Sequence, residues 1–271
     1  MMTTYKLQSL TGASAEIHAH GAHVTSWRTA DGVERLFLSR RAEFHAGAAI
    51  RGGIPIIFPQ FAGLGALPKH GFARTAQWQQ VSGTAASVDS VLFHLRDSEA
   101  THAIWPYPFM AEYAVTLGRD TLVIKLSIHN TGQQMFTFTA ALHTYLRVRN
   151  VDDVAIMGLQ GLHYRDSAVG GMDALEAASA LRIAGEVDRI YFGASRPIQV
   201  REPGQRAVEC SATGFADAVI WNPGAVKAAA LNDLEPEGYR HLLCVEAAAI
   251  EQSVALLPGS SWSGTQCLAV I

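Results

Sequence analysis

The chain has 271 residues, of which 49% are hydrophobic and 17% are charged, and its formal net charge at pH 7 is −3. This composition excludes an intrinsically disordered protein, because the chain holds enough apolar side chains to fill a core. The small negative charge argues against a nucleic-acid-binding or membrane-surface protein, since either would need a broad basic face. All-β domains of this length are common, so we expect one domain over residues 1–271.

The first residues and the cysteines indicate the compartment. The start Met-Met-Thr-Thr-Tyr-Lys-Leu lacks the basic stretch and apolar core of an export signal, and no apolar run approaches the length of a membrane span. We therefore expect a cytoplasmic protein without a membrane partner. Cys210, Cys244 and Cys267 are odd in number and form no C-x-x-C pair, so we expect buried free thiols.

Short β-type segments separated by turn signals follow one another along the chain. In the segment Thr121–Asn130, Leu122, Ile124, Leu126 and Ile128 alternate with other residues, which is typical of a half-buried strand. The predicted strands are, in chain order, Glu16–His20, Glu34–Leu38, Val88–Leu95, Tyr113–Leu117, Thr121–His129, Phe136–Leu142, Ala207–Ser211, Ala218–Trp221 and Leu243–Ala247.

Helical segments are few and short. One is predicted over Asp97–Trp105, with Asp97 or Ser98 as its N-cap, and another turn or two around Val226–Leu231. The Ala- and Gly-rich stretch Ala168–Ala184 is predicted to be a long loop. This distribution favours an all-β protein, a large antiparallel β-sandwich with a few short helical turns, over alternating βαβ units.

A segment rich in cations and turn formers is a candidate binding loop. It runs from Arg51-Gly-Gly-Ile-Pro to Leu67-Pro-Lys-His-Gly-Phe-Ala-Arg74 and contains almost no acid. Gly52 and Gly53 permit a positive φ or a close approach of the backbone to a ligand, and the prolines stiffen the segment. An anionic or polyhydroxyl ligand requires cationic side chains on such a rigid loop.

Glu246 and His143 are the candidate proton-transfer residues. Glu246 lies within the near-continuous apolar run Leu242–Ile250, where a carboxylate is unfavourable unless it is paired or functional. His143 ends the apolar strand Phe136–Leu142, and the two could supply a general base and a general acid. Each also has a structural interpretation, His143 as a hydrogen-bonded core histidine and Glu246 as the partner of a loop arginine.

Several short motifs occur in order along most of the chain. They are Thr25-Ser-Trp27, Arg51-Gly-Gly-Ile-Pro, Phe58-Pro, His70-Gly-Phe-Ala-Arg74, Ala103-Ile-Trp-Pro106, Ala141-Leu-His-Thr-Tyr145, Gly158-Leu-Gln-Gly161, Tyr164-Arg-Asp166, Trp221-Asn-Pro223 and Cys244-Val-Glu246. Together they resemble the aldose 1-epimerase (mutarotase) family, and within it the hexose-6-phosphate mutarotase branch. The resemblance implies a β-sandwich of the galactose mutarotase-like type, with the sugar lying across a concave face.

The resemblance also implies a reaction and its residues. It implies interconversion of the α and β anomers of a hexose 6-phosphate, glucose 6-phosphate by default, with no cofactor and no metal. The implied general acid is His143 and the implied general base is Glu246. The implied substrate contacts come from Arg51, Lys69, His70, Arg74 and Asp166.

Two positions depart from the family pattern. Lys69 stands where the family has glutamine before the histidine, and Leu146 stands where phenylalanine is expected after the His-x-Tyr motif. The first change adds a charge that favours phosphate or shifts the substrate preference, and the second repacks the wall of the site.

The chemistry agrees with two proton carriers. Anomer exchange removes the C1 hydroxyl proton, protonates the ring oxygen, rotates about C1–C2 in the open aldehyde and recloses the ring. Because an ordinary histidine has a pKa of about 6.5 and is mostly neutral at pH 7, we expect the Glu246 carboxylate to raise the pKa of His143. Three loop cations, Arg51, Lys69 and Arg74, exceed what neutral hydroxyls need and favour a phosphate.

Three alternatives stay open. The first is an aldose 1-epimerase for unphosphorylated hexoses, and the second is a non-catalytic sugar-phosphate binding module on the same fold. The third is a metal-dependent enzyme that uses His18, His20 and His23, because alternate spacing places His18 and His20 on one strand face. We expect a monomer that binds a small-molecule sugar phosphate and no nucleic acid.

Overall fold

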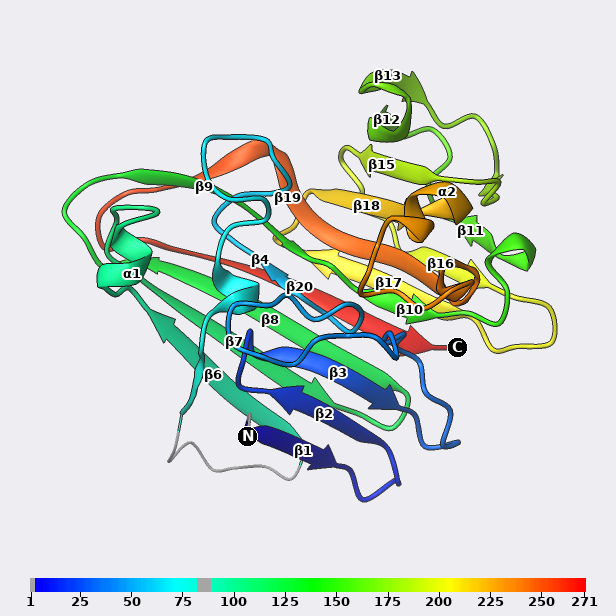
Figure 1. The fold of residues 1–271 in the computed structure, drawn as a ribbon, viewed down its shortest axis with the longest axis horizontal. Helices are drawn as coiled ribbons and strands as arrows, with labels where there is room; N and C mark the ends of the chain where they lie inside the picture. The colour runs from blue at the N-terminus through cyan, green and yellow to red at the C-terminus, as the bar shows by residue number, and fades with distance from the viewer. Residues whose placement is uncertain (1–2, 82–88) are drawn as a thin grey trace.

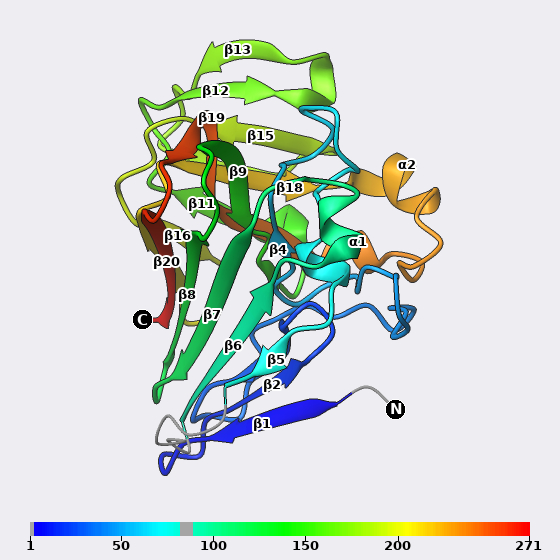
Figure 2. The same ribbon diagram turned by 90° about the vertical axis from the view of Figure 1, so that its left-hand side faces the viewer.

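The computed structural model describes residues 3–81 and 89–271, which form a β-sandwich of antiparallel strands. Two large sheets make its layers, and a three-stranded sheet lies over part of one of them (Figures 1 and 2). The rings of Tyr5 in the small sheet and Phe93 in the large one meet at a centroid distance of 5.1 Å. Phe93 is fully buried and belongs to the same core cluster as Ile124 and Leu142, so the small sheet covers the inner face of that large sheet, next to the other large sheet.

One large sheet, here called the site sheet, carries the residues of interest. Its strand order is β13 (Met172–Leu175), β12 (His163–Asp166), β15 (Val187–Tyr191), β18 (Asp217–Asn222), β19 (Leu242–Leu256), β9 (Phe136–Leu142) and β4 (Ile56–Ile57), and β10 (Tyr145–Arg147) also pairs with β19.

The other large sheet, the back sheet, closes the sandwich. Its order is β14 (Ala180–Leu181), β11 (Ala155–Met157), β16 (Ile198–Arg201), β17 (Val208–Thr213), β20 (Ser261–Val270), β8 (Thr121–Asn130), β7 (Phe109–Leu117), β6 (Ser90–Arg96) and β5 (Gln79–Gln80). The small sheet consists of β1 (Thr4–Gln8), β2 (Ser14–His18) and β3 (His23–Arg28). The helical turns are α1 (Glu99–His102), α2 (Gly224–Ala229), η1 (Ala73–Thr75), η2 (Val151–Asp153), η3 (Ser167–Val169) and η4 (Gly238–His241).

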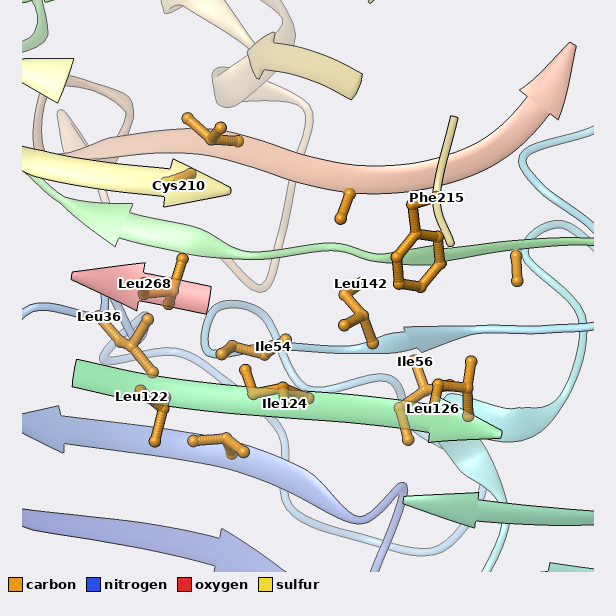
Figure 3. Close-up of a cluster of buried hydrophobic side chains, with 14 of the residues drawn as sticks. Leu36, Ile54, Ile56, Leu122, Ile124, Leu126, Leu142, Cys210, Phe215 and Leu268 are labelled. Atoms are coloured by element: carbon orange, nitrogen blue, oxygen red, sulfur yellow. The ribbon is translucent and has the colours of Figure 1, made fainter. Parts of the chain in front are cut away.

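The main core lies between the layers. Leu122, Ile124, Leu126 and Ile128 on β8 are fully buried, which confirms the alternation predicted for this strand. Figure 3 shows three of these side chains beside Leu142 of β9 and side chains from other strands. Burial of each such side chain contributes about 1.5–3 kcal/mol of transfer free energy, which offsets the entropy of ordering the strands. The core therefore holds the strands beneath the site in fixed register.

Most predicted strands are confirmed, with shifted ends. The structure extends the one predicted over Leu243–Ala247 into β19, which is 15 residues long. Residues Glu34–Leu38 form isolated bridges rather than a continuous strand. Of the strand predicted over Val88–Leu95, Val88 lies outside the described residues and positions 90–95 belong to β6.

The prediction of a long loop over Ala168–Ala184 is wrong. This stretch contains part of η3 and the strands β13 and β14, which pair with β12 and β11. Alanine and glycine have low intrinsic strand propensity, so the sequence showed no strand pattern here, and pairing with neighbouring strands overrides that propensity. The sequence also missed the strand β12 that supports β13.

The two short helices and the thiols lie close to their predicted places. Ser98 is the N-cap of α1, and its side chain accepts a hydrogen bond from the backbone of Thr101. The second helix, α2, begins two residues before the predicted segment. Free thiols are confirmed for all three cysteines, and Cys210 and Cys244 are buried whereas Cys267 is half-buried. Across positions 3–81 and 89–271, no helix is long and apolar enough to span a membrane.

Candidate active site

The strand register of the site sheet brings His143 and Glu246 together. Ala247 of β19 pairs with Leu142 at the end of β9, so the next residue, His143, lies beside Glu246. The backbone N–H of His143 is held by the carbonyl of Pro55 at 3.0 Å. Nδ1 of His143 lies 3.2 Å from Oε1 of Glu246, and both side chains are buried.

The pair forms the floor of a cavity of about 260 Å³. The cavity is lined by six of the seven residues that the sequence predicted for the site, namely Arg51, Lys69, His70, Arg74, His143 and Glu246. A larger cavity of about 500 Å³ lies between η1 and α1, but none of the predicted residues lines it. The chemistry-bearing residues therefore gather in the smaller cavity.

The two glycines after Arg51 approach the protein's own backbone. Gly52 and Gly53 have φ angles of +113° and +61°. A Cβ atom at Gly52 would meet the carbonyl oxygen of Phe37, and one at Gly53 would meet His23. Nε2 of His23 lies 2.8 Å from the carbonyl oxygen of Gly52. Glycine is required here because the loop must lie close against Phe37 and against β3 while it presents Arg51.

Arg51 is already neutralised by an acid. Its guanidinium lies 3.1 Å from Oδ2 of Asp233, and Nη1 donates a hydrogen bond to the Tyr145 hydroxyl at 3.0 Å. The ring of Tyr145 stacks on that of His143, with centroids 4.7 Å apart and planes within 10°. Asp233, Arg51 and Tyr145 therefore form a chain of contacts that ends on the imidazole.

Arg74 and Lys69 are cations without an acidic partner. Arg74 donates from Nη2 to the Lys69 carbonyl at 3.2 Å, and within the described residues neither side chain forms an ion pair. Nε of Arg74 is buried and has no hydrogen-bond partner among those residues. A buried unsatisfied donor costs about 1–3 kcal/mol, so this guanidinium is available to an anion in the cavity.

His70 is held as a neutral hydrogen-bond donor. Its backbone adopts the left-handed region at φ +67°, which histidine tolerates better than most residues. The Ala62 N–H donates to Nδ1 at 3.2 Å, so the ring proton is on Nε2. Burial and the nearby Arg74 lower the pKa of His70 to about 3. The imidazole therefore stays neutral at physiological pH.

The electrostatics of His143 and Glu246 correct one expectation about their pKa values. Burial, His70 and Arg74 lower the pKa of His143 well below its ordinary value, so the expected rise caused by Glu246 is wrong. Burial and Asp188 raise the pKa of Glu246. Nδ1 of His143 and Oε2 of Glu246 have no hydrogen-bond partner in the described structure, and the 3.2 Å contact of Nδ1 with Oε1 does not count as a hydrogen bond. These directions favour a neutral imidazole beside a protonated carboxyl, so the carboxyl of Glu246 carries the transferable proton.

The structure does not bring Asp166 to this cavity. Its Oδ2 lies 2.9 Å from Nε of Arg189, and its Oδ1 accepts from the backbone of Ala168 at 3.1 Å. Arg189 also lies 3.1 Å from Glu176. Asp166 thus belongs to an ion-pair network on β12 and β15, and the implied contact with substrate finds no support in this geometry.

Asp188 and Lys227 line the cavity but were missed by the sequence analysis. Asp188 pairs with Trp221 across β15 and β18, and Val219 pairs with Glu246 across β18 and β19. Trp221 and Val219 are two residues apart, so all four side chains share one face of the sheet. The alternation in Val187-Asp-Arg-Ile-Tyr191 was a weak signal for β15, because two charged residues interrupt its apolar pattern.

Two histidines of the metal alternative contact backbone carbonyls, and the third contacts a hydroxyl. Nε2 of His20 lies 2.7 Å from the carbonyl oxygen of Ala48, and His23 has the corresponding contact with Gly52. His18 lies 3.3 Å from the Thr4 hydroxyl through Nδ1. Within residues 3–81 and 89–271, no cluster of three or more His, Cys, Asp or Glu side chains is placed to hold a metal ion.

Comparison with known proteins identifies the family. The family model described as aldose 1-epimerase matches residues 3–269. A relative from Cenchrus ciliaris, provisionally named glucose-6-phosphate 1-epimerase, is 35% identical over 98% of this chain and 84% of its own length. A relative from Salmonella typhimurium with the same provisional name is 30% identical over 86% of this chain and 78% of its own length.

Comparison with solved structures gives the same family fold. A crystal structure of a provisionally named mutarotase from Salmonella typhimurium matches with a TM-score of 0.86 at 27% identity and covers 96% of this chain and 88% of that chain. A structure from Synechocystis sp. PCC 6803 has the same fold, with a TM-score of 0.84 at 23% identity over 100% of this chain and 96% of that one. The predicted galactose mutarotase-like β-sandwich is thereby confirmed, and the chain belongs to the aldose 1-epimerase family.

Proposed function

We propose that this protein is an isomerase that interconverts the α and β anomers of a hexose 6-phosphate, with glucose 6-phosphate as the default substrate. One observation carries the proposal. A buried His143–Glu246 pair, 3.2 Å apart, forms the floor of a cavity that also holds the unpaired guanidinium of Arg74. The provisional names of the relatives point to the same reaction.

The pair supplies both proton movements. Transfer of the carboxyl proton from Glu246 to His143 gives a carboxylate beside an imidazolium. The carboxylate then accepts the C1 hydroxyl proton while the imidazolium protonates the ring oxygen, which opens the ring. After rotation about C1–C2 the two transfers run in reverse on the other face of the aldehyde, so neither residue is consumed. The stacked ring of Tyr145 keeps the imidazole in place during these steps.

Two cations, rather than the three expected, are free to hold the phosphate. Asp233 neutralises Arg51, which leaves Arg74 and Lys69 without acidic partners in the described structure. A hydrogen bond between a guanidinium and a phosphate oxygen contributes about 1.5–3 kcal/mol. Arg51 instead contributes through Tyr145.

Polar groups at the cavity wall suit the sugar hydroxyls. Nε2–H of His70 is a fixed donor, and Asp188 is a carboxylate that can accept. Trp221 adds an aromatic ring whose centroid lies 5.9 Å from that of the His143 ring. A volume of about 260 Å³ is close to the lower end of the range for small-molecule sites, roughly 300–1,000 Å³, which fits a single sugar ring better than an oligosaccharide.

The test is an anomer-exchange assay on glucose, galactose and their 6-phosphates, measured in parallel by NMR magnetisation transfer. We expect exchange far above the solvent rate for a hexose 6-phosphate and a much smaller effect on the free sugars. Equal acceleration of phosphorylated and free sugars would contradict the phosphate assignment. Binding of the sugar phosphate with exchange at the solvent rate would show a non-catalytic binding module instead.

A further inference from the structure

Lys227 lines the cavity. It lies on a short helix that hydrogen bonds and close backbone contacts hold against the site sheet. This helix, α2, follows β18 directly and lies at the end of that strand, near the start of β15 (Figures 1 and 2). The fully buried Asn222 fixes this connection, because its side-chain amide donates to the carbonyls of Tyr239 and Leu242 at 2.8 Å and its Oδ1 accepts from Gly224 at 2.8 Å.

The start of the helix also lies close against the chain before β15. Gly224 has φ +60°, and a Cβ atom there would meet the backbone of Glu186. Replacement of this glycine would therefore push the helix away from β15. The helix presents Lys227 to the same segment, so the position of the ammonium relative to β15 is set by backbone geometry on both sides.

The ammonium of Lys227 contacts two carboxylates, one on β15 and one in the segment just before it. Nζ of Lys227 lies 2.6 Å from Oε1 of Glu186 and 3.8 Å from Oδ2 of Asp188. Glu186 thus anchors the ammonium, and Asp188 is its second, longer contact. Of the three residues, Lys227 and Asp188 line the cavity together with Glu246, whereas Glu186 does not.

Asp188 needs a nearby cation to serve as an acceptor. Its side chain is half-buried, and burial raises its pKa, as do Glu186 and Asp166. Lys227 and Lys69 act in the opposite direction, and Lys227 is the larger of the two. Asp188 in turn raises the pKa of Glu246, so the charge on Asp188 also reaches the acid–base pair.

We propose that Lys227 is a positioning residue of this site, which holds the Asp188 carboxylate as a fixed acceptor for the hydroxyl groups of the sugar. The inference rests on the proposed function. It differs from direct binding of phosphate by Lys227, in which the lysine would act on the substrate and not through Asp188. The 2.6 Å contact between Lys227 and Glu186 favours the positioning role, because an ammonium that is already paired with a carboxylate binds a phosphate less strongly.

A double-mutant cycle separates the two roles. The variants are Lys227→Met, Asp188→Asn and the double variant, each measured by exchange kinetics and by calorimetric titration with glucose 6-phosphate. We expect Lys227→Met to raise KM and Kd by about three- to tenfold. The double variant should match Asp188→Asn alone, because a residue that acts through another adds nothing once that other is removed. Losses that simply add would overturn the positioning role.

The pH profile gives a second readout. Loss of the ammonium raises the pKa of Asp188, so the acid limb of kcat/KM should move to higher pH in Lys227→Met and return in Lys227→Arg. An unchanged profile with a uniform loss of rate would contradict the proposal. Lys125→Met, at an exposed position of β8 on the back sheet, is the matched control and should behave as the parent protein.

Failure of the positioning role can be told apart from failure of the proposed function. A parent protein that binds glucose 6-phosphate without accelerating exchange would overturn the isomerase assignment, yet the cycle in Kd would still decide the role of Lys227. Thermal unfolding of each variant identifies any loss that comes from misfolding of α2.

Discussion

Two charged clusters on the site sheet differ in how completely their groups are paired. In the Asp166–Arg189–Glu176 network, Arg189 contacts Asp166 at 2.9 Å and Glu176 at 3.1 Å, and the Tyr191 hydroxyl donates to Glu176 at 2.9 Å. In the cavity, Arg74 Nε, His143 Nδ1 and Glu246 Oε2 are buried without partners among the described residues.

This difference distinguishes a structural network from a reactive site. Buried polar groups in folded proteins are nearly always hydrogen-bonded, and a satisfied network rigidifies the strands that carry it. Unpaired groups that gather in one cavity lower stability and are free to contact a substrate. Changes in the network should therefore affect stability, and changes in the cavity should affect activity.

The largest expected effect is on catalysis. Glu246→Gln removes the proton acceptor while it keeps the shape of the side chain, so the exchange rate should fall by about 10²–10⁴-fold. The free energy of unfolding should stay the same or rise, because a buried unpaired carboxyl is lost. Exchange kinetics and urea unfolding on the same sample measure both quantities. A strong loss of stability with retained rate would reverse the assignment of the two clusters.

The second effect is on stability. Glu176→Ala leaves Arg189 and the Tyr191 hydroxyl without their shared acceptor, and we expect a loss of about 2–4 kcal/mol in the free energy of unfolding. The exchange rate per folded molecule should remain near that of the parent. Urea unfolding measures the loss, and Glu209→Ala on β17 is a control of the same residue type away from the network. Loss of activity in fully folded Glu176→Ala would show that the network belongs to the site.

The third effect is on substrate affinity. Arg74→Ala removes the unpaired guanidinium, so KM for glucose 6-phosphate should rise by roughly 10–100-fold, which corresponds to about 1.5–3 kcal/mol. KM for glucose should change much less. Arg96→Ala at an exposed position of β6 is the control. Equal increases for both sugars would mean that Arg74 contacts the ring and not a phosphate.

The smallest effect at neutral pH concerns His70. Its pKa is about 3 in the folded protein and about 6.5 when unfolded, so the unfolded state binds the proton more readily. The stability from this group is complete above pH 6.5 and is lost as the pH falls toward 3. His70→Asn, which tolerates the left-handed backbone, should flatten this acid dependence of unfolding. An unchanged slope would show that folding does not lower the pKa of His70.

Local patterns in the sequence predicted the strands and the reactive pair. The alternation in Thr121–Asn130 requires a half-buried strand, and a carboxylate within the apolar run around Glu246 requires a partner or a task. Both features lie within a few residues of sequence. The family resemblance implied that His143 and Glu246 act together, but the register that places them side by side came from the structure, because pairing between β9 and β19 joins segments about a hundred residues apart.

Long-range ion pairs could not be predicted in this way. Arg51 is neutralised by Asp233, which is 182 residues away in sequence, so the count of free cations was too high. Asp166 sits in a motif shared with the family, yet Arg189 on the neighbouring strand takes its carboxylate. Asp188 and Lys227 meet only because α2 lies against the start of β15. Such contacts depend on strand order, which composition and spacing do not encode.

The most direct test of the central claim is the rate of anomer exchange of glucose 6-phosphate with equal amounts of the parent protein and His143→Asn. The asparagine keeps a polar side chain but cannot move a proton. We predict exchange well above the solvent rate for the parent, a loss of about 10²–10⁴-fold in the variant, and similar calorimetric affinity for both. Full activity in His143→Asn would contradict the assignment of this pair as the site of proton transfer.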